Sequence, residues 1–174
     1  MKKKNIKYLT SAALVAALYT ALTLVAAPIS FGPVQIRISE VLTVLPAVFP
    51  PAIIGLSLGC FLSNLIGFLT GLNPLGLIDC LVGTSATLVA ALLSYAAGRH
   101  FKGFLRGFLA ALSPIVVNGL FIGMEIAFVI LGDFSFKTTA LSCLYVALGE
   151  VLPCAVGAVL FLRNKTSIIS KILK

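Results

Sequence analysis

The sequence predicts an all-α integral membrane protein, and two features of its composition support this class. Of its 174 residues, 60% are hydrophobic and only 10% are charged, and the mean hydropathy is +1.14. Soluble domains ordinarily contain about 45–50% apolar and about 25% charged residues. Apolar runs long enough to cross a bilayer recur along the chain, which excludes a soluble globular domain.

Prolines and polar residues divide the chain into six predicted transmembrane helices within one membrane-embedded domain, 1–174, with no soluble domain. The first has a basic start and about 19 apolar residues, longer than a signal-peptide core, so we interpret it as an uncleaved helix that Pro28 ends. The second ends at Pro50-Pro51, because consecutive prolines cannot continue a helix. The predicted ranges are 8–27, 39–49, 52–71, 76–98, 104–131 and 137–163.

The second predicted helix is too short to cross a membrane alone. About 11 residues rise about 17 Å at 1.5 Å per residue, whereas the hydrocarbon core is about 30 Å thick. We therefore expect neighbouring helices to shelter it. A helix that stops within the membrane allows polar groups to line a cavity instead of facing lipid.

The basic residues predict that both termini are cytoplasmic. With an inside N-terminus and six crossings, 11 of the 13 Lys and Arg fall in the cytoplasm, and only Arg37 and Lys137 lie outside. The opposite orientation inverts the positive-inside bias. The formal charge of +8 does not indicate nucleic-acid binding, because the basic residues lie at segment ends rather than along one surface.

None of the five acidic residues falls on the cytoplasmic side of this topology. An ionised group within a bilayer costs about 2.5–3.5 kcal/mol or more, and such groups usually line an interior site or pair with each other. Glu125 and Glu150 are therefore predicted to be functional, whereas Asp79 suits a helix cap equally well. Asn64 and Asn118 either join the site or hydrogen-bond between helices. Five acids against two bases in the outer half suit a cation or a ligand rich in N–H donors.

The stretch FGPVQIRISE, residues 31–40, is the polar loop that leads into the second predicted helix. Ser39 is positioned as the N-cap, and Glu40 lies in the first turn, where a negative charge is favoured. We expect Gln35 and Arg37 to close over the outer cavity. The alternative is a cap with an Arg37–Glu40 surface pair, which stabilises little.

Longer stretches of the sequence resemble one family of membrane proteins. The spans and the small residues of the first helix resemble the substrate-binding S component of an energy-coupling factor (ECF) transporter. Three sequence segments resemble the QueT family, which is assigned to uptake of queuosine precursors. They are APISFGPVQIRISEVLTVLPAVFP, GLSLGCFLSNLIG and GLIDCLVGTSATLVAALL, in that order along the chain. The run QIRISE is close to that family's Q-F-R-[VI]-S-E pattern, with Ile36 where Phe is common.

The resemblance implies a six-helix S component that captures 7-aminomethyl-7-deazaguanine or queuine at its outer face. Its partners are a transmembrane coupling subunit and two ABC ATPases, and the sequence itself contains no G-x-x-x-x-G-K-[ST] phosphate loop. The substrate-binding candidates are Gln35, Arg37, Glu40, Asn64, Asp79, Asn118, Glu125 and Glu150. Ala13 and Ala17 match the family's docking site for the coupling subunit; the alternative is packing within this chain.

Other functions remain as alternatives at this point. One is an S component for another small vitamin or nucleobase, and others are an intramembrane enzyme with two catalytic carboxylates or a structural adaptor. The enzyme is disfavoured because the sequence has no nucleophile–base pair, and its single His, His100, is predicted in a cytoplasmic loop. The four cysteines have no metal-ligand spacing, so we expect neither a metal nor a cofactor.

Overall fold

The computed structural model describes residues 2–32, 35–133 and 135–163, and these residues form helices and their connections, with no strand among them. The elements in chain order are α1 (Lys2–Val25), α2 (Ala27–Ser30), the 3₁₀ helix η1 (Ile38–Ala47), α3 (Pro51–Leu69), α4 (Leu77–His100), α5 (Gly103–Glu125), the π-helix η2 (Ile126–Ile130), α6 (Phe136–Gly157) and the π-helix η3 (Ala158–Arg163).

Within the described residues, five helices are long and apolar enough to cross a membrane. They are Asn5–Val25, Pro51–Leu69, Leu77–His100, Gly103–Ile130 and Phe136–Phe161, with the shorter apolar helix Ile38–Ala47 between the first two. These bounds agree with the predicted ranges to within a few residues. The all-helical membrane class and the short second helix are therefore confirmed, whereas a sixth crossing stays a prediction.

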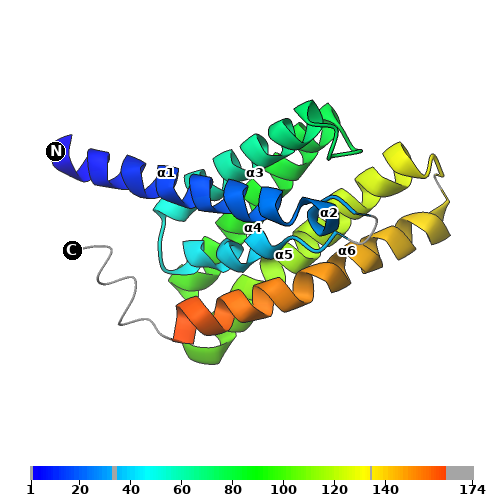
Figure 1. Ribbon diagram of the computed structural model, residues 1–174. Helices are drawn as coiled ribbons and strands as arrows, with labels where there is room; N and C mark the ends of the chain where they lie inside the picture. The colour runs from blue at the N-terminus through cyan, green and yellow to red at the C-terminus, as the bar shows by residue number, and fades with distance from the viewer. Residues whose placement is uncertain (1, 33–34, 134, 164–174) are drawn as a thin grey trace.

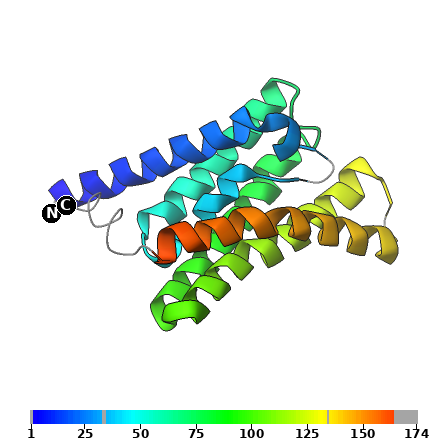
Figure 2. The ribbon, with the colours of Figure 1, turned by 60° about the horizontal axis from the view of Figure 1, so that its bottom comes forward.

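The long helices lie side by side in one bundle (Figures 1 and 2). Helix α1 packs on α3, α3 on α4, α4 on α5 and α5 on α6, while η1 lies among them and contacts α4, α6 and α1. One end of the bundle, the basic end, carries Lys7, Arg99 and Lys102. The opposite end, the far end, holds residues 70–76, between α3 and α4, and residues 131–133, after η2.

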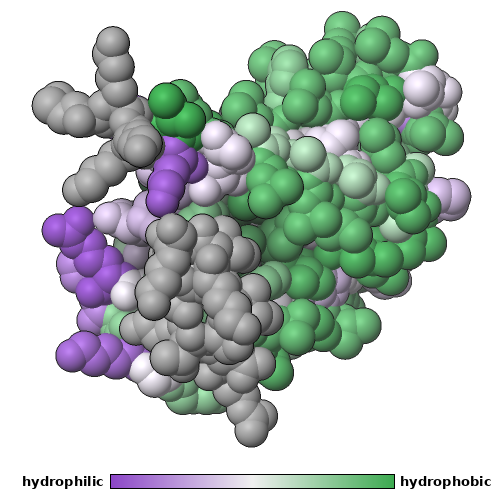
Figure 3. All heavy atoms as spheres, turned by 60° about the vertical axis from the view of Figure 1, so that its left-hand side comes forward, coloured by the Kyte–Doolittle hydropathy of each residue, from purple (hydrophilic) through white to green (hydrophobic). Residues whose placement is uncertain are grey.

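The surface view agrees with this division. Hydrophilic residues gather at the basic end, whereas hydrophobic residues cover most of the visible helices (Figure 3). Such an apolar belt is typical of a protein surrounded by lipid. Three of the predicted cytoplasmic cations, Lys165, Lys171 and Lys174, lie outside the described residues.

Three glycines allow the backbone of η1 and of the segment before it to enter the bundle. A Cβ on Gly98 of α4 would overlap the backbone of Ala47, and one on Gly157 of α6 would overlap the carbonyl of Val41. A Cβ on Gly149 would meet the carbonyl of Gln35. Because small residues let backbones approach closely in a membrane, these positions fix where the short helix lies.

Other glycine pairs pack long helices together. Gly55 and Gly59 of α3 lie against α1, and Gly119 and Gly123 of α5 lie against Cys143 and its neighbours on α6. Gly71 has a φ of 73° and nothing near its missing Cβ. Gly71 serves the turn after α3, because glycine adopts positive φ without strain.

Two local predictions are wrong. Helix α1 ends at Val25, before Pro28, and Pro28 lies in the first turn of α2, where a proline is tolerated because that N–H has no helical partner. Ser39 is not an N-cap: η1 begins after Arg37 with no side-chain cap, and the Ser39 hydroxyl instead accepts a hydrogen bond from Thr23 at 2.7 Å.

We predict that Gly98→Ala or Gly157→Ala destabilises the protein by about 1–3 kcal/mol, because the added methyl group displaces the backbone of η1. Thermal unfolding in detergent measures this change. The exposed Ala140→Val on α6 is the control and should leave the unfolding temperature unchanged. Wild-type stability in both glycine variants would show that η1 does not depend on these contacts.

Candidate functional site

The fold brings all eight predicted binding residues into the interior of the bundle. None of them exposes more than 5% of its surface. They come from η1 and the segment before it, and from α3, α4, α5 and α6: Gln35, Arg37, Glu40, Asn64, Asp79, Asn118, Glu125 and Glu150. We call these residues the polar cluster. Buried charges are stable only with partners, so the hydrogen bonds of the polar cluster indicate which members have structural roles.

Arg37 pairs with Asp79, which lies 42 positions away in the sequence. The guanidinium donates to Asp79 Oδ2 at 2.9 Å and lies 5.6 Å from the ring centroid of Phe31. Asn73 donates to the same carboxylate oxygen at 2.8 Å. The Arg37–Glu40 surface pair considered above is therefore wrong, and Asp79 does not cap α4. This buried pair ties the first loop to the start of α4.

Asn64 and Gly83 hold this region of α3 and α4 together. Asn64 Nδ2 donates to the backbone carbonyl of Asp79 at 2.8 Å, which is the interhelical bond considered for it above. A Cβ on Gly83 would overlap the Asp79 carboxylate and approach Asn64 Nδ2 to 2.8 Å. Glycine at this position, one turn after Asp79, therefore makes room for both side chains.

Glu40 and Glu150 form a second group of charges deeper along η1. The Tyr19 hydroxyl donates to Glu40 Oε1 at 2.5 Å, and Asn118 donates to Glu150 Oε1 at 3.4 Å. The Cys154 thiol lies 3.7 Å from Glu150 Oε2. The same thiol lies 4.0 Å from the backbone carbonyl oxygen of Glu40, so Cys154 contacts both acidic residues.

Glu125 differs from the other acids because neither of its carboxylate oxygens has a hydrogen-bond partner, although the residue is only 5% exposed. It is the last residue of α5, and the π-helical turn η2 follows it at once. Single π-helical turns often occur at functional sites. Further unpartnered acceptors are Glu40 Oε2, Asn64 Oδ1 and Asp79 Oδ1.

A cavity of about 500 Å³ opens at the far end, and Ile126, the residue that follows Glu125 in the chain, is part of its lining, whereas no member of the polar cluster is. Its lining comes from the first loop, the α3–α4 loop, η2 and α6, and consists of Phe31, Pro74, Ile126, Ile130, Leu131, Thr138, Leu141, Ser142 and Tyr145. We call it the far-end cavity. Small-molecule binding sites have volumes of about 300–1,000 Å³ and are mostly apolar with a few polar groups. The far-end cavity has both properties.

Sequence reasoning missed three contributors to this region: Tyr19, Phe31 and Asn73. The available sequence signal for Tyr19 was its position within an apolar span, because the hydroxyl of a tyrosine inside the membrane needs a hydrogen-bond partner. Asn73 precedes Pro74 and has the pattern of a simple turn residue. No group of three or more His, Cys, Asp or Glu able to hold a metal occurs among the described residues.

Comparison with known proteins identifies the family. A family model described as "QueT transporter" matches residues 9–165. The chain belongs to the QueT transporter family. The protein is thus a member of a transporter family and not an enzyme, so the intramembrane-enzyme alternative is set aside.

One curated relative of this QueT family member is the "Queuosine precursor transporter QueT" of Lactococcus lactis subsp. cremoris (strain MG1363). The two proteins are 35% identical over 104 residues, which cover 59% of this chain and 57% of the relative. The aligned region therefore spans little more than half of that relative's length. No solved structure matches the chain.

We predict that Arg37→Gln and Asp79→Asn each destabilise the protein by about 3–5 kcal/mol, because each leaves a buried charge without its partner. The double variant should lose clearly less than the sum of the two single losses, which a double-mutant cycle of unfolding free energies measures. Lys137→Gln, at the same end but exposed, is the control. Strict additivity of the two losses would show that the pair is not coupled.

Proposed function

We propose that this protein is the substrate-binding S component of an ECF-type ABC transporter, and that it captures a queuosine precursor for ATP-driven uptake. The ligand class is a 7-deazaguanine, namely 7-aminomethyl-7-deazaguanine or queuine. Family membership and the name of the L. lactis relative support the substrate class. The observation that carries the binding site is the buried, unpartnered carboxylate of Glu125.

The chemistry of the unpartnered atoms favours a ligand with many donors. The polar cluster contains several buried side-chain atoms without hydrogen-bond partners, and all of them except Arg37 Nε are acceptor oxygens. A deazaguanine presents a ring N–H beside an exocyclic amine, and one carboxylate can accept both hydrogen bonds. We assign this role to Glu125, because both of its oxygens are unpartnered and the next residue, Ile126, lines the far-end cavity.

The second group of acids suits a positively charged substituent. An aminomethyl group is a cation, and Glu40 and Glu150 both lie next to Cys154, whose thiol contacts the Glu150 carboxylate and the Glu40 carbonyl. Glu150 is held by hydrogen bonds from Asn118 and the Cys154 thiol, and Glu40 by one from Tyr19. We assign the aminomethyl group to Glu150, with Glu40 as its neighbour.

In this proposal six helices cross the membrane, and both termini lie in the cytoplasm with the basic end. The far-end cavity then opens to the outside, where the precursor arrives. The clustering of Lys7, Arg99 and Lys102 at one end of the structure supports this orientation through the positive-inside bias. Gln35 and Arg37 lie in the loop beneath the far end and close the site.

The docking surface for the coupling subunit is the outward face of α1. Ala12 and Ala16 are buried against α3, whereas Ala13, Ala17 and Ala21 are exposed in a stripe along the helix. Packing within this chain therefore uses the other face of α1. The exposed small side chains permit the close approach of a partner helix.

We predict that Glu125→Gln weakens binding of both 7-aminomethyl-7-deazaguanine and guanine by about tenfold or more. The amide presents a donor to ligand donors, and a charge-assisted hydrogen bond contributes about 1.5–3 kcal/mol. Calorimetric titration of the purified protein measures both affinities. The control is Asp133→Asn: hydrogen bonds from Thr138 and Ser135 hold the pKa of Asp133 below its usual range, so this exposed acid at the same end is ionised. The control should bind normally.

We predict that Glu150→Gln weakens binding of 7-aminomethyl-7-deazaguanine by about tenfold but changes guanine affinity little, because guanine lacks the cationic substituent. The ratio of the two affinities is the measured quantity. Unchanged affinities for both ligands in both variants, Glu125→Gln and Glu150→Gln, would mean that these acids are structural and that the ligand binds elsewhere.

We predict that Ala13→Trp or Ala17→Trp abolishes uptake in cells, because the indole blocks the partner helix, while the isolated protein keeps its ligand affinity. Uptake of labelled precursor and calorimetry on the same variants test the two halves. Ala140→Trp, exposed on α6, is the matched control. Normal transport by both α1 variants would exclude this docking face.

A further inference from the structure

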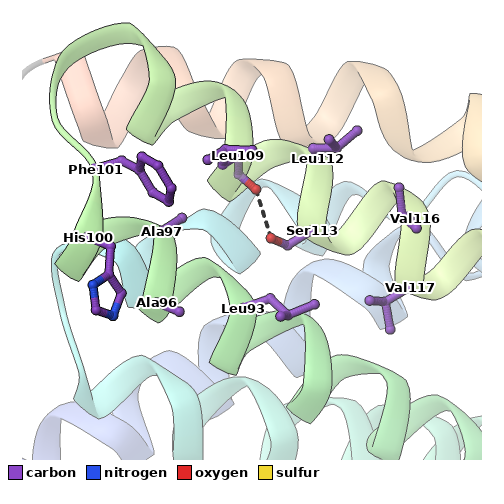
Figure 4. Close-up of a pocket in the computed structure, with 10 residues that line it drawn as sticks. All are labelled: Leu93, Ala96, Ala97, His100, Phe101, Leu109, Leu112, Ser113, Val116 and Val117. Atoms are coloured by element: carbon purple, nitrogen blue, oxygen red, sulfur yellow. Dashed lines mark hydrogen bonds between the residues drawn. The ribbon is translucent and has the colours of Figure 1, made fainter.

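Helices α4 and α5 leave an apolar groove between them toward the basic end, and no member of the polar cluster lines it. Its volume is about 560 Å³. Figure 4 shows the side chains that line it, which come from the last two turns of α4, the link after it and the middle of α5: Leu93, Ala96, Ala97, His100, Phe101, Leu109, Leu112, Ser113, Val116 and Val117. We call it the α4–α5 groove.

The lining of the α4–α5 groove requires an apolar occupant. Ala96 and Ala97 provide the hollow on the α4 side, opposite the larger Leu109 and Leu112 of α5 (Figure 4). The hydroxyl of Ser113 already donates to the Leu109 carbonyl at 2.7 Å, so it needs no partner from an occupant. The side of the groove formed by α5, from Leu109 to Val117, is about 12 Å long. This is less than half of the about 30 Å hydrocarbon core, so a lipid acyl chain from one leaflet can extend along it.

The mouth of the same groove is basic. His100 is the last residue of α4 and lines the groove, and Lys102 lies in the two-residue link to α5. Arg99 is exposed beside them. All five acids of the sequence lie elsewhere, in η1, near the far end or within α6. Basic residues at the end of an apolar groove between membrane helices are the pattern that binds anionic lipid headgroups.

We propose that the α4–α5 groove binds an anionic phospholipid. One acyl chain lies along Leu93, Leu112 and Val116, and the phosphate lies at the mouth beside His100 and Lys102. The acyl chain supplies the affinity, because it covers apolar surface in a concave site. The charges of Lys102 and Arg99 supply the preference for an anionic over a zwitterionic headgroup, since each Lys or Arg near the surface adds about fivefold to anion binding.

The test is native mass spectrometry of the full chain in detergent, titrated with phosphatidylglycerol or with phosphatidylcholine of the same acyl chains. The wild type should retain phosphatidylglycerol over phosphatidylcholine. Lys102→Gln with His100→Gln should reduce retained phosphatidylglycerol about fivefold or more, without reducing phosphatidylcholine. Ala96→Phe fills the hollow and should reduce the binding of both lipids.

Two matched controls separate this site from general lipid contact. Lys137→Gln removes one cation at the far end, and Ala140→Phe adds the same bulk at an exposed position on α6; both should retain lipid as the wild type does. Equal retention of the two lipids by the wild type overturns the proposal. Retention of phosphatidylglycerol by the Lys102→Gln, His100→Gln variant at the level of Lys137→Gln also overturns it. So does an Ala96→Phe variant that retains phosphatidylglycerol but no longer assembles with other membrane subunits, since the groove is then a protein contact.

Discussion

Close backbone contact between η1 and its neighbours determines what the interior of this protein contains. Gly98 on α4 and Gly149 and Gly157 on α6 let the segment from Gln35 to Ala47 enter the bundle. The segment carries Arg37 and Glu40 into a region with little water, where each charge needs a partner. Arg37 forms a salt bridge with Asp79, and Glu40 accepts a hydrogen bond from the Tyr19 hydroxyl. The arrangement of α1, α4 and the first loop follows from these two contacts.

Once those pairs are formed, the unpartnered atoms of the polar cluster are mainly acceptor oxygens, and this imbalance gives the cluster its chemical preference. Glu125 keeps both oxygens unpartnered, and the residue after it, Ile126, lines the far-end cavity. Helix α1 joins this site to the outside of the bundle: Tyr19 and Thr23 contact Glu40 and Ser39, while Ala13 and Ala17 lie on its exposed face. One face of α1 thus contacts the polar cluster, and its other face is the candidate docking surface.

The sequence was sufficient for features that depend on composition and length, and insufficient for those that depend on tertiary contacts. Hydropathy predicts the long helices, and Pro50-Pro51 predicts where the short one stops. The high cost of a charge in a membrane singles out Glu125 and Glu150. The Arg37–Asp79 pair is not predictable from local rules, because its members are 42 positions apart. The assignment of Ser39 as an N-cap failed because Thr23, on another helix, bonds its hydroxyl.

In our proposal a deazaguanine binds to the unpartnered acceptors of the polar cluster. An experimental structure of the protein with bound 7-aminomethyl-7-deazaguanine tests it most directly. The account predicts that the ring N–H and exocyclic amine lie at about 2.7–3.2 Å from the two oxygens of Glu125, with the aminomethyl nitrogen near Glu150. A ligand bound outside the far-end cavity and the polar cluster, with Glu125 still unpartnered, would contradict it.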